Sequence, residues 1–345
     1  MSNNKVGMFG GKFIPIHVGH VYAMIYASTM VNELHVIVSY DEDYEREHYY
    51  KDAKVPFIPH EIRVRWWRQI TKDMPFVHVH SIYEPQTGQF SDWELGAERI
   101  KAVVGKPIDT VFSSEESYGS YFEKLYPSAE HIVIDPQRKT YNISATTIRK
   151  EGAMKHWERL PTVVKPYFVK KVVIVGTESA GKSTLVQNLA CLYNTTYVEE
   201  FGRTFYDRIG SYDTLPDDFP EIAFQHHLLI QNQLQKAERL LFVDTEALVT
   251  QYFSIAYEGI RQPILDEVAK LQHFDLWLFL EPDVKWIDDG TRVFGEEEIR
   301  IRNNEWLKSI LAEKRIQYVS ISGNYQERLE QAMVQVNKLI EVNGS

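Results

Sequence analysis

The chain has 345 residues, which exceeds the usual length of a single domain, so two domains are expected. Hydrophobic residues make up 44% of the sequence and charged residues 25%, a globular composition that excludes wholesale disorder. The formal net charge of −10, without a dense block of lysine and arginine, argues against a nucleic-acid-binding protein.

The cysteine content and the termini predict the compartment. Cys191 is the only cysteine, which excludes an intramolecular disulfide and a cysteine-based zinc site. The N-terminus lacks the apolar core of a secretory signal, and no stretch approaches the roughly 18 apolar residues of a membrane span. We therefore expect a cytoplasmic protein without membrane insertion. The sequence does not determine the oligomeric state, and a homo-oligomer is compatible with it.

The first half of the chain alternates predicted strands and helices. We expect strands over residues 6–9, 34–39, 76–80, 110–112 and 131–134, with helices near 19–31, 60–73 and 92–104. This alternation is typical of a doubly wound parallel sheet. Residues 1–150 are predicted to form the first domain.

The second half repeats the pattern after a short segment. Residues 151–168 contain Pro161, Pro166 and several aromatic residues, which predicts a short, docked linker. Residues 169–345 are the predicted second domain, with strands over 171–175, 196–198, 240–243 and 276–280 and helices near 182–192, 221–239 and after 325. The predicted fold class is α/β, with two doubly wound parallel-sheet domains.

Residues 176–183 read GTESAGKS and match the phosphate-loop pattern G-x-x-x-x-G-K-[ST] at every fixed position. They follow a predicted strand and open a predicted helix, as this motif requires. Glycines let backbone N–H groups converge on the phosphates, Lys182 reaches the β and γ phosphates, and Ser183 ligates Mg²⁺. The expected nucleotide-binding residues are Gly176, Thr177, Glu178, Ser179, Ala180, Gly181, Lys182, Ser183 and Thr184.

Other charged residues of the second half are candidates for the acceptor and metal sites. Asp244 ends an apolar strand and would orient the metal, although an acidic turn is the alternative interpretation. Glu199 and Glu200, with Arg203, suit a general base and a charge clamp, and one of the two carboxylates can simply be solvated. Arg292 would belong to a lid over the transferring phosphoryl group, where an exposed charged helix is the alternative.

Residues 10–20 read GGKFIPIHVGH and connect the first strand to the first helix. His17 and His20, together with the helix N-terminus, would surround one anion, and Lys12 would add a point charge. Gly10 and Gly11 would let the backbone approach this ligand. The turn therefore predicts a phosphate site.

A zinc site at this turn would need a third ligand. His78 and His80 are available, but they lie two residues apart on an alternating strand. We interpret them as a surface pair with satisfied hydrogen bonds, and the zinc hypothesis stays a minor one.

Residues 142–149 read NISATTIR. Ser144 is a predicted N-cap, and the following N–H groups, the Thr146 hydroxyl and the Arg149 guanidinium would together hold a pyrophosphate. A capped surface helix explains this octapeptide about as well.

The motifs K-F-x-P-x-H-x-G-H and I-S-x-T-x-I-R resemble the signature pair of the nicotinamide-mononucleotide adenylyltransferases, within the HxGH nucleotidyltransferases. With the phosphate-loop half, nearly the whole chain resembles the NadR-type family, which joins this activity to a ribosylnicotinamide kinase. Enterobacterial members carry a helix-turn-helix repressor domain ahead of the enzyme, whereas the first strand here begins by residue 6, so repression is not implied. The resemblance implies ribosylnicotinamide, nicotinamide mononucleotide and ATP as substrates, Mg²⁺, and NAD as product.

For the first domain, the resemblance implies direct attack of the mononucleotide phosphate on the α-phosphorus of ATP. Lys12, His17 and His20 would surround the α and β phosphates, with His20 most important for rate. In the second motif, Ser144, Thr146 and Arg149 would hold the departing pyrophosphate. Trp93 is the candidate for stacking on the nicotinamide ring, and a core-anchoring role is the alternative. Further expected nucleotide contacts are Gly10, Gly11, Phe13, Ser113, Ser114 and Glu115.

For the second domain, the resemblance implies that Lys182 and Ser183 bind ATP and Mg²⁺. Glu200 or Asp244 would accept the proton of the ribose 5′-hydroxyl. Arg203 and Arg292 would hold phosphates. The two domains would then catalyse consecutive salvage steps. Two alternatives stay open: a similar fusion for another metabolite, such as FMN or phosphopantetheine, and a nucleotide-binding sensor with weak activity.

Overall fold

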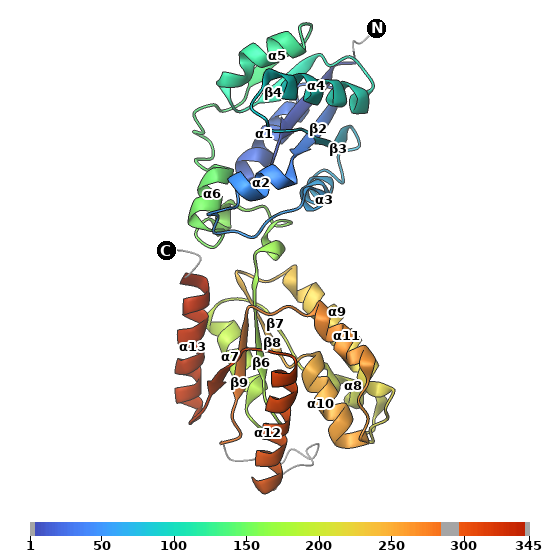
Figure 1. The fold of residues 1–345 in the computed structure, drawn as a ribbon, viewed down its shortest axis with the longest axis vertical. Helices are drawn as coiled ribbons and strands as arrows, with labels where there is room; N and C mark the ends of the chain where they lie inside the picture. The colour runs from blue at the N-terminus through green and yellow to red at the C-terminus, as the bar shows by residue number, and fades with distance from the viewer. Residues whose placement is uncertain (1–3, 284–296, 342–345) are drawn as a thin grey trace. The chain divides into compact units, whose positions relative to one another are not determined.

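The computed structural model describes residues 4–283 and 297–341. The chain forms two compact units, one ending at Phe168 and the other beginning at Val169. Each unit contains a five-stranded parallel sheet with helices around it (Figure 1), which confirms the predicted fold class. Among the described residues, the helices are all too short or too polar to cross a lipid bilayer.

The first sheet has the strand order β3-β2-β1-β4-β5. Its strands are β1 (Val6–Gly11), β2 (Glu33–Tyr40), β3 (Val77–Tyr83), β4 (Thr110–Ser113) and β5 (Glu130–Val133). Strand β1 pairs with β2 on one side and with β4 on the other, so the order reverses at β1. Sheets of this kind bind ligands at the carboxyl end of the strands beside such a reversal.

Helices cover both faces of the first sheet. They are α1 (Val18–Ser28), α2 (Glu42–His48), α3 (His60–Ile70), α4 (Phe90–Val104), α5 (Gly119–Leu125) and α6 (Ala145–Glu151). On one face, Ala97 of α4 and Leu125 of α5 belong to the same buried cluster as Met8 of β1. On the other face, Trp67 of α3 packs edge-on against Phe9 of β1, with ring centroids 6.3 Å apart. Burial of these aromatic and aliphatic side chains stabilises the central strand.

Residues 151–168 pack onto the first unit. Trp157 is fully buried, and the Tyr167 hydroxyl donates to the carbonyl of Phe57 at 2.5 Å. The Tyr167 ring also lies edge-on to Trp66, at 5.5 Å between centroids. Two short 3₁₀ helices, Trp157–Arg159 and Lys165–Tyr167, complete the segment. It therefore extends the core of this unit.

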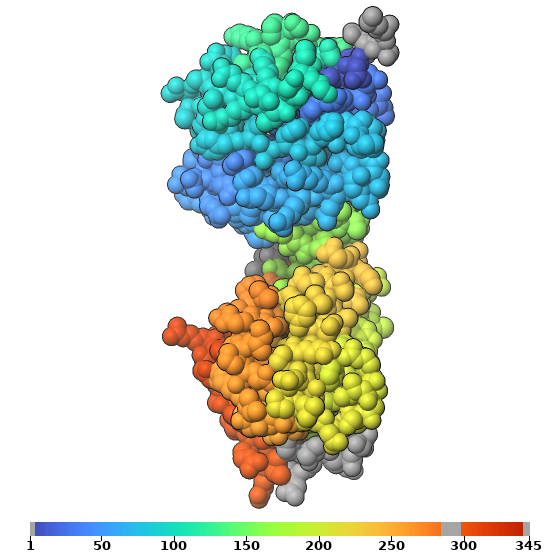
Figure 2. All heavy atoms as spheres, turned by 90° about the vertical axis from the view of Figure 1, so that its right-hand side faces the viewer, coloured from blue at the N-terminus to red at the C-terminus, as the bar shows by residue number. Residues whose placement is uncertain are grey.

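The second sheet has the order β10-β9-β6-β8-β7. Its strands are β6 (Lys170–Val175), β7 (Tyr197–Val198), β8 (Leu240–Asp244), β9 (Leu276–Leu280) and β10 (Val319–Ile321). Its helices are α7 (Lys182–Leu192), α8 (Phe201–Ile209), α9 (Asp218–Leu234), α10 (Ala247–Glu258), α11 (Pro263–Leu271), α12 (Glu297–Glu313) and α13 (Tyr325–Glu341). Leu189 of α7 and Val336 of α13 share a buried cluster with Phe242 of β8. Helices α8 to α11 form the yellow-to-orange face of this unit in Figure 2.

The central strands lie close to their predicted ranges, and the differences are at the periphery. The predicted helix over 221–239 begins earlier and ends at Leu234 as α9, and the predicted strand over 76–80 continues to Tyr83 as β3. Helices α2, α5, α8, α10 and α11 and strand β10 were not expected, and a helix at α12 was expected only as the alternative to a lid. Most of these helices are short, and short helices depend on tertiary packing more than on their own sequence.

Candidate active sites

A cavity of about 230 Å³ lies at the carboxyl end of β1. Its wall combines the loop after β1, the end of β4 and the start of α6, which are far apart in sequence. They meet because parallel strands end at one edge of the sheet. The predicted residues that line it are Gly10, Gly11, Lys12, Phe13, His17, His20, Ser113, Ser114, Glu115, Ser144 and Thr146.

The two motif histidines stack at the start of α1. His17 is the N-cap residue, and its ring centroid lies 3.7 Å from that of His20. The main-chain N–H of His17 donates to Nδ1 of His20 at 3.4 Å. A Cβ at Gly19 would lie 3.0 Å from His17 Nδ1, tighter than ordinary contacts allow. Glycine between the histidines therefore leaves room for the first ring.

Burial determines the charge of this histidine pair. It lowers the pKa of His17 to about 3, and the nearby Arg138 contributes to the decrease. Burial also lowers the pKa of His20, with further contributions from His17 and Arg138. Nδ1 of His17 is buried and has no hydrogen-bond partner among the described residues. Both rings are therefore neutral near pH 7, and a ligand oxygen in the cavity would complete the hydrogen bonding of His17.

Helix α6 supports the loop after β1. Ser144 caps the helix as predicted, since its Oγ accepts the N–H of Thr147 at 3.0 Å. Arg149 is 8% exposed and donates to the Ile14 carbonyl at 2.7 Å and to the Thr146 hydroxyl at 3.1 Å. Its side chain thus holds the loop from behind the cavity, and direct binding of pyrophosphate stays a prediction for this arginine.

A further cation in this cavity has no counterpart among the sequence predictions. Arg138 lines the cavity and forms an ion pair with Glu115 at 2.8 Å. It lies in a loop shaped by Asp135, whose carboxylate accepts the N–H groups of Lys139 and Thr140. No motif spacing marks this arginine. Its basic charge just ahead of the second motif is the one signal that the sequence offered.

Trp93 belongs to an aromatic cluster between α4 and α5. Its ring stacks on Tyr121 at 4.7 Å between centroids and also contacts Tyr118 and Phe122. Tyr118 lines the cavity, whereas Trp93 packs against the buried core of the unit. In this arrangement Trp93 anchors its helix, and its stacking on a nicotinamide ring stays a prediction.

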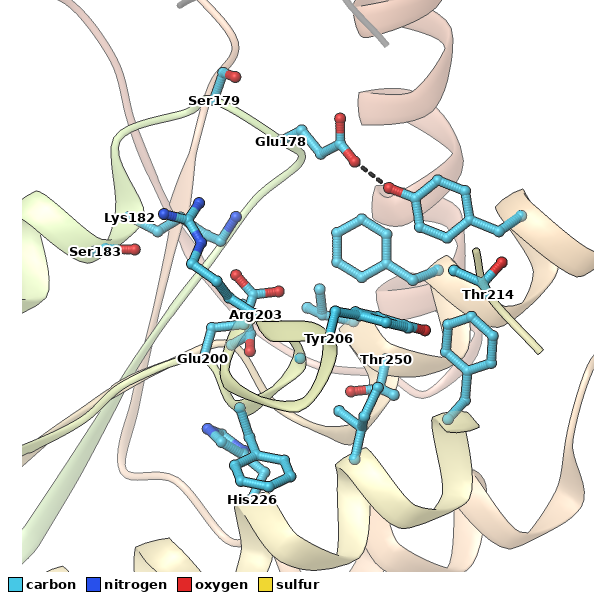
Figure 3. A pocket seen from close by; sticks show the side chains of 18 of the residues that line it. Glu178, Ser179, Lys182, Ser183, Glu200, Arg203, Tyr206, Thr214, His226 and Thr250 are labelled. Carbon is cyan, nitrogen blue, oxygen red and sulfur yellow. Dashed lines mark hydrogen bonds between the residues drawn. The ribbon is translucent and has the colours of Figure 1, made fainter. Parts of the chain in front are cut away.

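A cavity of about 650 Å³ lies beside the phosphate loop of the second unit (Figure 3). Three of the residues predicted for this unit, Gly176, Thr177 and Asp244, are not part of its lining. The predicted residues that line it are Glu178, Ser179, Ala180, Gly181, Lys182, Ser183, Thr184, Glu200 and Arg203.

The loop before α7 has the backbone of a phosphate-binding loop. Gly176 and Gly181 have φ angles of 152° and 85°, a region that favours glycine. A Cβ at Gly176 would lie 2.8 Å from the carbonyl oxygen of Leu280 in β9. The buried Lys182 ammonium donates to the Thr177 carbonyl at 3.1 Å, so its side chain folds back along the loop. Successive amides in such a loop form an anion-binding concavity.

Ser183 and Asp244 meet beneath the loop. The Ser183 hydroxyl donates to Oδ2 of Asp244 at 2.5 Å. Asp244 is 1% exposed, and its Oδ1 has no hydrogen-bond partner among the described residues. Burial raises the pKa of Asp244 to about 7, while Lys182 acts in the opposite direction. A hydroxyl and a carboxylate in these positions hold Mg²⁺ in phosphate-loop proteins.

The structure separates the two adjacent glutamates at the start of α8. Glu200 lines the cavity and lies next to Arg203 (Figure 3). Glu199 is exposed and accepts from the side chains of Gln187 and Tyr197, away from the lining. Arg292 lies outside the described residues, so its predicted place in a lid stays an expectation.

An aromatic wall completes the second cavity and has no counterpart among the sequence predictions. It is formed by Tyr206 of α8, Tyr212 of the following loop, and Phe253 and Tyr257 of α10. The spacing of Phe253 and Tyr257 would place them on one helix face, but α10 itself was not predicted.

Residues 8–151 match the cytidylyltransferase-like family model, and residues 171–328 match an AAA domain model. With the two cavities, these matches define a nucleotidyltransferase domain followed by a phosphate-loop kinase domain. The chain is 32% identical over 346 residues to the trifunctional NAD biosynthesis/regulator protein NadR of Escherichia coli (strain K12), covering 97% of this chain and 83% of that protein. The chain belongs to the NadR family.

Two further comparisons agree with this assignment. The NadR protein of Salmonella typhimurium is 32% identical over 349 residues, which cover 99% of this chain and 84% of that protein. A crystal structure of a NadR protein in complex with NR has a TM-score of 0.82 at 24% identity, covering 99% of this chain and 97% of that one. A second, in complex with NAD and AMP-PNP, has a TM-score of 0.81 at 22% identity, covering 98% and 97%. The two-domain fold is therefore that of known NadR structures.

Proposed function

We propose that this chain catalyses two consecutive ATP-dependent steps of NAD salvage. The second unit phosphorylates the ribose 5′-hydroxyl of ribosylnicotinamide, and the first unit adenylylates the resulting mononucleotide, which yields NAD and pyrophosphate. The observation that carries this proposal is that a chain of the NadR family holds two separate cavities, each lined by its own phosphate-binding motif.

In the kinase step, the 5′-oxygen forms a bond to the γ-phosphorus while the bond from that phosphorus to ADP breaks. Lys182 and the loop amides hold the phosphates. Glu200 is the proposed base for the hydroxyl proton, because it lines the cavity whereas Asp244 is buried behind Ser183. Ser183 and Asp244 would hold Mg²⁺, which supplies charge neutralisation, and the unpaired Oδ1 of Asp244 suits that role.

In the adenylylation step, a phosphate oxygen of the mononucleotide forms a bond to the α-phosphorus while the bond to pyrophosphate breaks. His17 and His20 would donate hydrogen bonds to the α and β phosphates, and Lys12 and Arg138 would supply positive charge. Without a bound phosphate both imidazoles are neutral, and a bound phosphate anion would raise their pKa values and so strengthen these hydrogen bonds. Catalysis then consists of positioning and charge stabilisation.

The test is product analysis after incubation of the protein with ribosylnicotinamide, ATP and Mg²⁺. Wild-type protein should form NAD, His20→Ala should accumulate the mononucleotide, and Lys182→Ala should form neither product from the riboside but convert added mononucleotide to NAD. An unchanged riboside with the wild-type protein would refute the kinase assignment. Turnover of FMN or phosphopantetheine in place of nicotinamide mononucleotide would favour the alternative function, an adenylyltransferase and kinase fusion for that metabolite.

A further inference from the structure

The phosphate loop of the second unit contains a carboxylate that the binding of ATP does not explain. Glu178 lies within the loop, between Thr177 and Ser179, where a negative charge directed at the phosphates would repel them. Figure 3 shows its side chain directed away from Lys182 and across the cavity. There Glu178 accepts a hydrogen bond from the Tyr257 hydroxyl of α10. The loop therefore places the positive charge of Lys182 on one side of the cavity and the negative charge of Glu178 on the side of α10.

Tyr257 holds this carboxylate on the side of the cavity lined by α10, away from Lys182, where the phosphoryl acceptor would bind. Burial, followed by the neighbouring Glu178, raises the pKa of Tyr257, so its hydroxyl stays protonated and remains a donor. The ring of Tyr257 is nearly parallel to that of Phe253, with an angle of 7° and 5.6 Å between centroids. Both rings come from one helix, which gives the carboxylate a rigid partner.

The rest of this wall is aromatic as well. Tyr206 and Tyr212 line the same cavity, with their ring centroids 6.1 Å apart. Lys182 and Arg203 supply the positive charge at the phosphate side, and Asp213 adds a second carboxylate to the lining. Aromatic faces combined with a carboxylate recognise a flat organic cation by cation–π attraction and charge pairing.

We propose that the Glu178 carboxylate, positioned by Tyr257, is the counter-charge for a positively charged heterocycle on the acceptor. The kinase site then selects an N-ribosylated pyridinium over nucleosides with a neutral ring, and it rejects rings that carry a carboxylate. This specificity rests on the proposed kinase function and adds a residue that determines it. It also explains why a phosphate loop tolerates an acidic residue.

The variant Glu178→Gln tests the role of the charge, because it keeps the shape and the acceptor for Tyr257. The substrates are ribosylnicotinamide and its 1,4-dihydro form, which has the same substituents on an uncharged ring. In the variant, kcat/KM should fall about tenfold or more for the cation and change less than about threefold for the neutral riboside. The riboside of nicotinic acid should become a better substrate than it is for the wild type.

Matched controls separate this effect from a general loss of structure. Glu267→Gln makes the same chemical change on the exposed surface of α11, where Glu267 pairs with Lys270, and should leave every substrate unaffected. Tyr257→Phe removes the donor and should lower the preference for the cation in the same direction as Glu178→Gln. Retained turnover of the uncharged riboside by each variant reports that the second unit is folded.

The outcomes distinguish this inference from the proposed function. If the wild type phosphorylates ribosylnicotinamide and Glu178→Gln keeps the same cation-to-neutral ratio, the inference is wrong and the function stands. If the wild type does not use ribosylnicotinamide, the function is wrong, and NMR titration with N1-methylnicotinamide and nicotinamide decides the inference. Wild-type protein must then bind the cation more tightly, and Glu178→Gln must lose that preference. Equal binding of both rings overturns it.

Discussion

At the scale of single residues, burial changes the chemistry of side chains whose motifs alone suggest ordinary ionisation. Asp244 has a pKa raised to about 7 by burial, and His17 has a pKa lowered to about 3 by the same cause. Near neutral pH, the aspartate is therefore partly protonated and the histidine is neutral. A carboxyl group in this state binds a proton and a divalent cation in competition.

This competition predicts a pH-dependent requirement of the kinase for Mg²⁺. The proton leaves Asp244 as the pH rises through about 7, so the concentration of Mg²⁺ for half-maximal activity should be several-fold lower near pH 8 than near pH 6. Steady-state kinase assays at a series of Mg²⁺ concentrations measure this value. An equal value at both pH values would contradict a metal-binding Asp244 with a pKa of about 7.

At the scale of elements, each phosphate loop has its carbonyl oxygens held by buried arginines from other elements. Arg63 of α3, ion-paired with Glu45, donates to the Lys12 carbonyl at 2.8 Å. In the second unit, Arg328 of α13 donates to the Ala180 carbonyl at 2.6 Å. These bonds turn carbonyl oxygens away from the cavities, which leaves amides and lysines to face the phosphates.

Substitution of these arginines should give a reciprocal result. Lysine keeps the charge but cannot form the same forked hydrogen bonds, so Arg63→Lys should lower adenylyltransferase activity about tenfold and leave the kinase unchanged. Arg328→Lys should lower the kinase about tenfold and leave the adenylyltransferase unchanged. Both activities are measured on each preparation. Equal loss of both activities in either variant would mean that the substitution destabilises the whole chain.

At the scale of the whole molecule, the two units carry different sets of buried titratable groups. In the first, burial lowers the pKa of His17 to about 3 and that of His80 to about 4. In the second, the pKa of His226 is lowered to about 4, but burial raises those of Asp244 and Glu246 to about 7. Below the usual histidine pKa of 6.5, unfolding takes up protons at the histidines, whereas the raised carboxyls release theirs.

Acidification should therefore destabilise the first unit more than the second. Each net proton taken up on unfolding lowers the free energy of unfolding by about 1.4 kcal/mol per pH unit. In the second unit, the protons that Asp244 and Glu246 release on unfolding offset the proton that His226 takes up. In the first unit, the raised pKa of Glu45 offsets only part of the protons that the histidines take up. The temperature at which half of each activity survives, measured after heating at about pH 5 and about pH 7, should fall more for the adenylyltransferase. A larger fall for the kinase would contradict this.

The sequence by itself determined the features that depend on local chemistry. The two phosphate motifs, the strands that precede them and the cap at Ser144 follow from residue types at fixed spacing, and the structure has each of them in place. The family follows from the same motifs, because each phosphate site needs particular residues at fixed spacing and their combination in one chain is specific.

Only the tertiary structure decided which partners these residues have. Arg138 reaches Glu115, Arg149 holds the Ile14 carbonyl, and Glu178 meets a tyrosine of α10, far along the chain. Side chains choose such partners by long-range packing and burial, which local sequence patterns do not encode. For the same reason residue spacing did not separate Glu199 from Glu200; the resemblance named Glu200, and the fold has only Glu200 in the lining of the cavity.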